Sequence, residues 1–264
     1  MSPFPQLSSG AQVQYPLTRV QRIRTARTES PDGYEFRLAD QNSATVEWEI
    51  RYKGLTSDER TWLETHFAEA EGRLRRFTFL DAASNLLRWS ENLADAVWDT
   101  GPLVGKTGGQ PDPLGGTAAW RLVNTAITPQ RVAQTIPAPA GFTYAFSLYA
   151  RSTGPDAIRL IHEGGQTSVA ADRPVNEGWQ RVSSAAKLGQ SGANITFAVE
   201  MAPGAAIDVF GFQVDPQPAP SSYRRTTSRS GVFNDARYAE DSLRVVAAAN
   251  GLFEAHVRLI ARGL

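Results

Sequence analysis

The chain has 264 residues with 27 basic and 27 acidic side chains, so its formal net charge is zero. No bulk attraction to nucleic acid or to a membrane surface follows from that balance. The sequence contains no cysteine, which excludes disulfides, cysteine-based zinc sites, iron–sulfur clusters and thiol catalysis. No apolar run reaches the roughly 18 residues of a membrane-spanning helix, and no secretion signal is expected at the start of the sequence. We therefore expect no membrane partner.

The first part of the chain predicts strands. The residues from Val13 to Thr28 are expected to be extended, and the turn-forming residues 30–33 separate them from a second strand. From Thr45 to Lys53 polar and apolar residues alternate, which is typical of a half-buried strand. The apolar face of that strand holds Val46, Trp48, Ile50 and Tyr52.

A helix of about 14 residues is predicted next. The motif Thr56-Ser57-Asp58-Glu59 matches a capping box, in which the threonine hydroxyl accepts from a backbone amide and the glutamate reaches back. Gly72 is expected to end the helix in the left-handed conformation, and residues 76–81 predict another short strand. We expect His66 to be a partly exposed surface residue. The core-facing positions would be Trp62, Leu63, Phe67 and Ala70.

The composition changes at Asn85. From there to about Ser230 the chain is rich in Thr, Ser, Gly, Pro and Ala, and short alternating stretches are separated by turn signals such as residues 139–141 and 163–165. Strands at this spacing, without a long helical pattern, predict a β-sandwich or jelly roll.

The last part of the chain again resembles the first. Residues 242–249 and 252–261 predict two strands that are joined at Asn250-Gly251, a strong hairpin signal. Two strands alone are marginally stable in water, so we expect them to join the sheet of the first segment. The fold class is therefore mainly β with one helix. A discontinuous first domain (residues 1–83 and 230–264) would be interrupted by an inserted β-sandwich (residues 84–229).

The order of short motifs in the discontinuous domain resembles a family of phage proteins. The motifs are Phe4-Pro5, Gln14-Tyr15-Pro16, Asp32-Gly33-Tyr34, Trp48 to Tyr52, and Phe77-Thr78-Phe79-Leu80-Asp81. In this order they resemble distal tail proteins and lambda gpM-like minor tail proteins of long-tailed phages. The resemblance implies a tail-hub ring, usually a hexamer, that joins the tail tube to the tip or baseplate of the virion.

The same resemblance implies the partners and the location. The ring would contact the tail tube protein, tail tip and hub proteins and other copies of this chain, and it would be assembled in the host cytoplasm. DNA would pass through its lumen only as cargo.

The middle block resembles the carbohydrate-binding-module-like jelly rolls of phage structural proteins. The matching motifs are Asn85-Leu86-Leu87, Gly141 to Tyr149, Trp179 to Val182, Phe210 to Val214, and Pro220 to Tyr223. The resemblance implies an outward module that touches host cell-surface glycans. Calcium is often structural in modules of this shape, but the sequence identifies no ligands for it, and we expect no cofactor and no other metal.

Sugar binding by a jelly roll needs an aromatic face and a few convergent polar groups. Tyr149 is the best single candidate, because it alternates with the apolar positions Phe146 and Leu148 on its predicted strand. The guanidinium of Arg159 would donate hydrogen bonds to a sugar. The alternative for Trp98 is a place in the hydrophobic core. The glycan-binding candidates are Tyr149, His162, Arg159 and Trp98.

A ring would use the exposed strand edges of the first domain, which would pair with neighbouring subunits. Cyclic closure makes the interface heterologous, so one face of the protomer must complement another. The interface candidates are the charged, outward positions Glu47, Glu49, Arg51, Lys53, Glu254, Arg258 and Arg262, and His256 is expected to point outward with them.

No catalytic constellation is visible. The three histidines are far apart, a Gly-x-Ser-x-Gly motif is absent, and Glu200 and Asp208, predicted on adjacent strands, favour a structural role. We therefore predict no catalytic residues and no enzyme. Two alternatives stay open: a monomeric or trimeric glycan-binding adhesin that decorates the virion, and an enzyme that acts on host polysaccharide.

Overall fold

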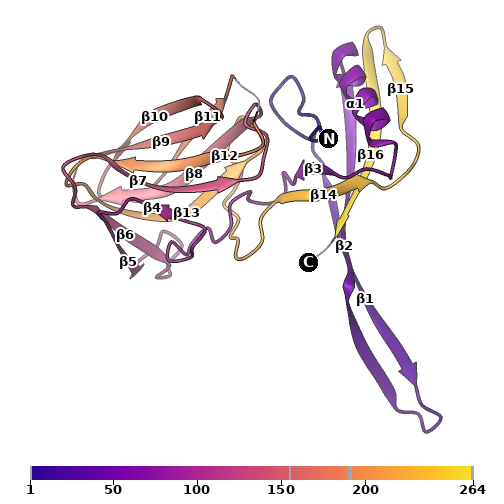
Figure 1. Cartoon of the computed structure of the whole chain (residues 1–264), viewed down its shortest axis with the longest axis horizontal. Coiled ribbons are helices and arrows are strands. Elements are labelled where there is room, and N and C mark those ends of the chain that lie inside the picture. The colour runs from indigo at the N-terminus through magenta and orange to yellow at the C-terminus, as the bar shows by residue number, and fades with distance from the viewer. Residues whose placement is uncertain (1, 155, 190–191, 263–264) are drawn as a thin grey trace. The chain divides into compact units, whose positions relative to one another are not determined.

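The computed structural model describes residues 2–154, 156–189 and 192–262. Over these residues the chain forms sixteen strands, β1 to β16, and one helix, α1 (Figure 1). The prediction of a mainly β fold with one helix is confirmed. The chain divides into two compact units: unit 1 comprises residues 1–8, 12–79 and 233–264, and unit 2 comprises residues 9–11 and 80–232. No helix in the described ranges is long and apolar enough to cross a membrane.

A six-stranded sheet forms the body of unit 1. Its order is β1-β2-β16-β14-β3, and β15 pairs with β16. The strands are β1 (Thr18–Glu29), β2 (Glu35–Leu55), β3 (Phe77–Leu80), β14 (Val232–Tyr238), β15 (Arg244–Ala249) and β16 (Leu252–Arg262). β15 and β16 are the hairpin predicted at Asn250-Gly251, and Gly251 has the positive φ of 71° that this turn requires.

The predicted alternation of residues 45–53 is confirmed. Val46, Trp48, Ile50 and Tyr52 are all buried on one face of β2. The indole of Trp48 packs edge-on against two aromatic rings from distant parts of the chain, with centroids 4.9 Å from Phe79 and 4.6 Å from Phe233. This buried face brings β2, β3 and β14 into one core.

Helix α1 (Ser57–Ala70) has the predicted length and the predicted capping box. The hydroxyl of Thr56 accepts from the backbone N–H of Glu59, and the Glu59 carboxylate accepts in return from the backbone N–H of Thr56. The helix ends one residue earlier than expected, because Glu71 already adopts the left-handed conformation before Gly72 does. The cap therefore relies on a non-glycine residue.

The predicted buried face of α1 needs correction. Leu63, Ala70 and His66 are buried, whereas 46% of Trp62 is exposed. His66 is covered by the N-terminal segment: its ring lies 5.6 Å from that of Phe4, and its Nδ1 lies 2.8 Å from the Tyr238 hydroxyl. Burial lowers the pKa of His66 to about 4, so this histidine is a neutral core residue at pH 7.

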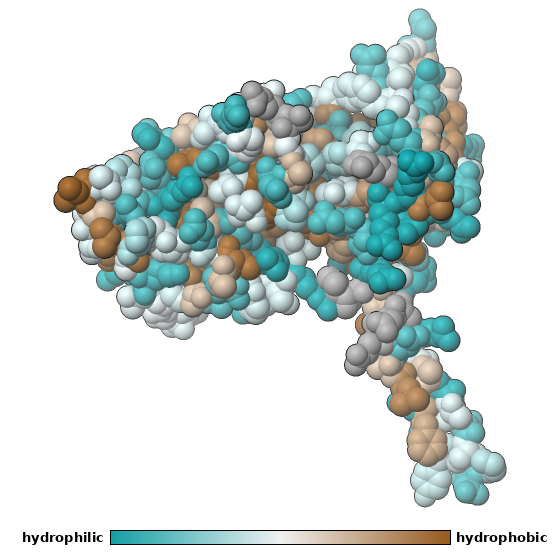
Figure 2. Space-filling view, in the orientation of Figure 1, coloured by the Kyte–Doolittle hydropathy of each residue, from teal (hydrophilic) through white to brown (hydrophobic). Residues whose placement is uncertain are grey.

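The hairpin of β1 and the first half of β2 extends beyond the other strands of unit 1 (Figure 1). All twelve residues of β1 are exposed. The cross-strand register places Ala26 beside Leu38 and Thr28 beside Phe36 on one face, with 69% of Leu38 and 60% of Phe36 exposed. Hydrophobic side chains are visible along this hairpin in Figure 2. An apolar strip thus lies in solvent on a two-stranded ribbon.

Unit 2 is a sandwich of two five-stranded sheets. The β9 sheet has the order β10-β9-β12-β7-β4, and the β8 sheet has the order β11-β8-β13-β6-β5. The strands of the β9 sheet are β10 (Thr167–Val175), β9 (Asp156–Gly164), β12 (Ile195–Met201), β7 (Gln130–Ile136) and β4 (Asp99–Thr100). Those of the β8 sheet are β11 (Gln180–Lys187), β8 (Thr143–Ser152), β13 (Ala206–Asp215), β6 (Ala119–Asn124) and β5 (Val104–Gln110).

One apolar core fills the space between these two sheets. Phe146 and Leu148 of β8 face Leu160 of β9 and Phe197 of β12, and all four side chains are fully buried. All described strand pairs of the sandwich are antiparallel. The prediction of a β-sandwich in the middle of the chain is confirmed.

Candidate functional site

The structure separates the four predicted glycan-binding residues. Tyr149 lies on the outward face of the β8 sheet, because it alternates with the buried Phe146 and Leu148. Arg159 lies on the outward face of the other sheet. His162 and Trp98 are 1% and 4% exposed, inside the sandwich. The four residues therefore do not form one site.

Trp98 is a core residue rather than a platform for a ligand. Its ring packs on Phe212 at a centroid distance of 4.8 Å, and its indole N–H donates to the backbone oxygen of Trp89 at 3.1 Å. Both the ring faces and the polar group are thus used inside the protein. The alternative interpretation of the sequence, a place for Trp98 in the core, is confirmed.

His162 lies between the two sheets. Its Nε2 is 2.8 Å from the hydroxyl of Ser184 on β11, and its ring contacts Phe197 at 5.2 Å. Burial lowers its pKa to about 4, so the ring is neutral at pH 7. A sugar outside the sandwich cannot reach it. The alternation along β9 that turns Arg159 outward turns His162 inward.

The outward face of the β9 sheet is occupied by ion pairs and small residues. Arg159 pairs with Asp172 at 2.8 Å and with Glu200 at 3.4 Å. Ala133, Ile161 and Ala198 form a small apolar cluster between these charges. The outward positions of the described strands of this sheet hold no aromatic residue.

The expected neighbours Glu200 and Asp208 also belong to different sheets. Glu200 is on β12 of the β9 sheet, and Asp208 is on β13 of the β8 sheet. The two strands follow one another along the chain as predicted, but β12 pairs with β7 and β9 while β13 pairs with β6 and β8. These carboxylates do not face a common cleft.

The outward face of the β8 sheet carries aromatic rings. Tyr149 is partly exposed, and its ring centroid lies 6.1 Å from that of Phe210 on β13 and 6.4 Å from that of Tyr223. The guanidinium of Arg181, on the neighbouring strand β11, lies 5.7 Å from the centre of the Tyr149 ring. Gly211, at a bulge in β13 with a φ of 65°, leaves room for the Tyr223 ring. We call Tyr149, Phe210 and Tyr223 the aromatic cluster.

A second aromatic residue on this face adjoins an arginine. Arg151 is two residues beyond Tyr149 and therefore also points outward. Its guanidinium lies 4.8 Å above the ring of Trp179, which is partly exposed. Within the described part of the chain the indole N–H of Trp179 has no hydrogen-bond partner. Trp179 thus offers an apolar ring and a free donor to a ligand.

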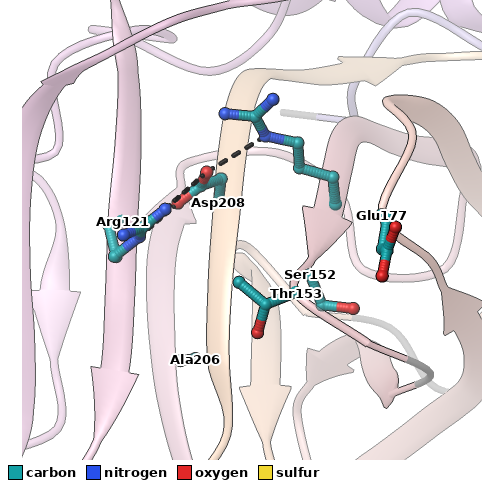
Figure 3. A pocket seen from close by; sticks show the side chains of 7 residues that line it. Arg121, Ser152, Thr153, Glu177, Ala206 and Asp208 are labelled. Carbon is teal, nitrogen blue, oxygen red and sulfur yellow. Dashed lines mark hydrogen bonds and ion pairs between the residues drawn. The ribbon is translucent and has the colours of Figure 1, made fainter.

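A hollow of about 380 Å³ begins beside Arg151, where β8 ends and β13 begins. It is lined by Arg121, Arg151, Ser152, Thr153, Glu177, Ala206 and Asp208 (Figure 3). Asp208 binds Arg121 on one side and Arg151 on the other, at 2.8 and 3.0 Å. In Figure 3 Glu177 lies across the hollow from Arg121. We call this the arginine pocket.

The charges of the arginine pocket are unequally accessible. The carboxylate of Asp208 is only 5% exposed, whereas Arg121 is 44% exposed and Arg151 28%. The hydrogen bonds and charge of Asp208 raise the pKa of the Arg121 guanidinium, so the positive charge is permanent. A ligand in the pocket therefore meets guanidinium groups before it meets the buried carboxylate.

Sequence reasoning identified Tyr149 but missed Trp179, Arg151, Arg121 and Asp208. One signal was present: Tyr149 and Arg151 share the outward side of one predicted strand, since side chains alternate along a strand. The partners of Arg151 come from other strands, and Asp208 is 57 residues further along the chain. Only the pairing of the strands brings these residues together.

The seven predicted interface residues do lie on one surface. Cross-strand pairing puts Arg51 beside His256 and Glu49 beside Arg258 on the exposed face of β2 and β16. Glu47 pairs with Arg22 at 2.7 Å, and the pKa of its carboxyl is lowered by that hydrogen bond. Lys53, Glu254 and Arg262 belong to the same face. The role of this charged face in assembly stays a prediction.

In the described ranges no group of three or more histidine, aspartate or glutamate side chains is arranged to hold a metal ion. The sequence led us to expect no cofactor and left a structural calcium open, without ligands, and this stays a prediction.

The chain is similar in fold to solved structures. No family model and no curated protein matches this chain. The enzymatically active domain of tailspike protein 4 from bacteriophage CBA120 is 14% identical with a TM-score of 0.42, and the match covers 51% of this chain and 22% of the tailspike chain. The CBM22-1 xylan-binding domain of Xyn10C from Paenibacillus barcinonensis is 12% identical with a TM-score of 0.42, covering 52% of this chain and 96% of that domain. TmCBM61, solved with β-1,4-galactotriose, is 15% identical with a TM-score of 0.35, covering 49% of this chain and 97% of that module.

Proposed function

We propose that unit 2 is a carbohydrate-binding module and that its binding surface is the outward face of the β8 sheet. One observation carries the proposal. Of the two outward faces of the sandwich, this one combines partly exposed aromatic rings, Tyr149 and Trp179, with the arginine pocket. The other face has ion pairs and alanines at the corresponding positions.

The chemistry of this face suits a sugar. An aromatic ring buries the apolar C–H face of a pyranose, and neighbouring polar groups fix the orientation of its hydroxyls. Trp179 is held in place by the guanidinium of Arg151, and Tyr149 is held by Phe210 and Arg181. Rings that are fixed before binding lose little side-chain entropy when a ligand arrives.

The test is affinity electrophoresis of the full chain in gels that contain soluble xylan, β-glucan, galactan, polygalacturonate or alginate. We expect retardation by at least one of these polysaccharides, and we expect Tyr149→Ala and Trp179→Ala each to weaken it by about tenfold or more, as for aromatic anchors at other interfaces. The matched control is Trp62→Ala, which removes an exposed aromatic residue from unit 1, outside the apolar strip of the hairpin. Equal retardation of Tyr149→Ala, Trp179→Ala and wild type would overturn the proposed surface.

We further propose that unit 1 assembles with other copies of this chain, in the ring of a phage tail tip that the sequence resemblance implies. Three features support assembly: the apolar strip of the β1–β2 hairpin, the open edge of β1 and the charged face of β2 and β16. Two-stranded ribbons are marginal in water, and open strand edges invite pairing with another chain. In that setting the carbohydrate-binding module would contact glycans of the host surface.

Native mass spectrometry of the full chain tests the assembly. We expect an oligomer, and we expect the double variant Phe36→Ser, Leu38→Ser to shift it towards the monomer. Leu114→Ser is the matched control, because Leu114 of unit 2 is similarly exposed, at 67%. A chain that stays monomeric at every concentration would favour the adhesin alternative over the ring.

A further inference from the structure

We infer that the arginine pocket binds the carboxylate of an acidic glycan, one built from uronic acids or other carboxylated sugars. The inference rests on the proposed function of the β8 sheet and names the class of sugar that this face selects. It follows from a count of the hydrogen-bond donors and acceptors that the pocket leaves free.

Both oxygens of Asp208 already accept hydrogen bonds from arginines. Arg121 donates to both oxygens of this carboxylate, from Nε at 2.8 Å and from Nη2 at 3.1 Å, and Arg151 donates from Nε at 3.0 Å. The carboxylate is also 95% buried, since its exposed fraction is 5%. It therefore cannot accept hydrogen bonds from the hydroxyls of a neutral sugar, as a free aspartate in a sugar site would.

The donors, in contrast, are in excess. Nη1 and Nη2 of Arg151 and Nη1 of Arg121 have no hydrogen-bond partner among the described residues. Guanidinium N–H groups match the two oxygens of a carboxylate in geometry and in charge, and such charged hydrogen bonds are among the strongest in proteins.

The position of Arg151 is fixed before any ligand binds. Asp208 accepts from its Nε, and its Cζ lies over the ring of Trp179, 4.8 Å from the ring centre. The two terminal nitrogens make no hydrogen bond with Asp208 or with another described residue, and little side-chain entropy is lost when they bind a ligand. A pyranose that stacks near Trp179 would bring a carboxylate on its ring within reach of these nitrogens.

Glu177 supplies the complementary acceptor. It is exposed, it lies across the hollow from Arg121 (Figure 3), and it forms no ion pair with the described residues. Its carboxylate can accept from sugar hydroxyls but repels a sugar carboxylate. The pocket thus has a cationic side and an anionic side, which orients an acidic sugar with its carboxylate towards the arginines.

The experiment compares each acidic polysaccharide with its own methyl ester. Polygalacturonate, alginate, hyaluronan and polysialic acid are titrated into the full chain by isothermal calorimetry, and each methyl ester serves as the matched neutral ligand. We expect at least one acid form to bind about tenfold or more tightly than its ester, because charged hydrogen bonds add to affinity. Added salt should weaken the acid form and leave the ester unchanged.

Variants locate the effect. Arg151→Gln should weaken binding of the acid form by about tenfold to a hundredfold and leave the ester form unchanged. Arg151→Lys keeps the charge but loses the paired N–H donors of the guanidinium, so we expect an intermediate loss of affinity for the acid form. This variant replaces Arg151→Gln if that one fails to fold. Arg159→Gln is the control, because it removes the same charge from the outward face of the β9 sheet.

The outcomes separate the inference from the proposed function. If a glycan binds but its acid and ester forms bind equally, or if Arg159→Gln costs as much as Arg151→Gln, the acidic-sugar inference is overturned while carbohydrate binding stands. If no polysaccharide of either panel binds to the wild-type chain, the proposed function itself is overturned.

Discussion

The two outward faces of the sandwich share one core but differ in chemistry. The β8 sheet presents Tyr149 and Trp179, with Arg121 and Arg151 around one buried carboxylate, that of Asp208. The β9 sheet presents ion pairs such as Arg159–Asp172 among alanines. Both sheets obey the same alternation, in which every second residue must fill the interior.

The difference teaches where the information about function lies. Inward positions are constrained by packing and are mostly apolar on both sheets, with the buried pair of His162 and Ser184 as an exception. Outward positions are free of that constraint, so an aromatic ring held there, with its surface partly exposed, has a cost in solvation that packing does not explain. The contrast between the two faces, more than the fold, supports the proposed binding surface.

The largest effect is expected from a variant that disrupts the apolar core, which both sheets share. Phe146→Ala deletes a fully buried ring that contacts Phe197 and Phe212. We expect unit 2 to lose about 3–5 kcal/mol of unfolding free energy, because the cavity cannot collapse. Urea denaturation measures the loss. Leu114→Ala, at a 67% exposed position of the same unit, is the control and should change stability by less than about 0.5 kcal/mol. A similar cost for both variants would contradict the common core.

The second effect is a pH dependence of the free energy of unfolding, caused by His162, which lies between the two sheets. Burial lowers its pKa to about 4, below the ordinary value of 6.5, so the unfolded chain binds the proton more tightly than the folded chain. The contribution of His162 to the free energy of unfolding is fully present above pH 6.5. It is lost as the pH drops towards 4, and the loss amounts to roughly 3 kcal/mol.

Calorimetric unfolding of wild type and His162→Gln between pH 7 and pH 4 measures this contribution as the difference between the two curves. Parallel curves for wild type and His162→Gln would show that the buried histidine does not cause the pH dependence.

The third effect disturbs the aromatic cluster without touching its rings. A Cβ at Gly211 would lie 3.0 Å from the Tyr223 ring, at a φ of 65°. We expect Gly211→Ala to cost about 1–2 kcal/mol and to weaken glycan binding by displacing Tyr223. Gly204→Ala is the matched control, since Gly204 also has a positive φ, 75°, but open space around its Cβ. Equal glycan affinities of the two variants would separate Tyr223 from the binding surface.

The smallest effect concerns the face without aromatic residues. Arg159→Ala breaks two exposed ion pairs, with Asp172 and Glu200. Such pairs contribute little in water, so we expect a loss of less than about 0.5 kcal/mol and unchanged glycan binding. Thermal denaturation measures the first and affinity electrophoresis the second. A tenfold loss of glycan affinity would move the binding surface to the β9 sheet.

The local features of this fold were predictable from the sequence. The capping box of α1, the alternation around Trp48 and the turn at Asn250-Gly251 each depend on a few adjacent residues, and all three are confirmed. What the sequence could not predict was burial by distant segments. His66 is exposed on an isolated helix and becomes buried only because the N-terminal segment and Tyr238 cover it.

The candidate site was predictable only in part for the same reason. Alternation gave the outward direction of Tyr149, but no local pattern tells which sheet a strand joins. Arg159 therefore seemed a neighbour of Tyr149 and lies on the other sheet. The carboxylate that organises the arginine pocket comes from 87 residues beyond Arg121.

The way the chain passes into and out of unit 2 has a consequence for how such proteins diversify. The backbone N–H of Asp81 donates to the oxygen of Gly231 at 2.7 Å, and that of Gly231 donates to the oxygen of Asn85 at 2.8 Å. β3 and β14, the strands that precede and follow the sandwich, are themselves neighbours in one sheet. A recombination event with crossovers at these two adjacent points would exchange the whole sandwich as a cassette, and chain ends this close together are what such exchanges require. Ligand preference could then change in a single genetic step while the sheet of unit 1 kept its sequence.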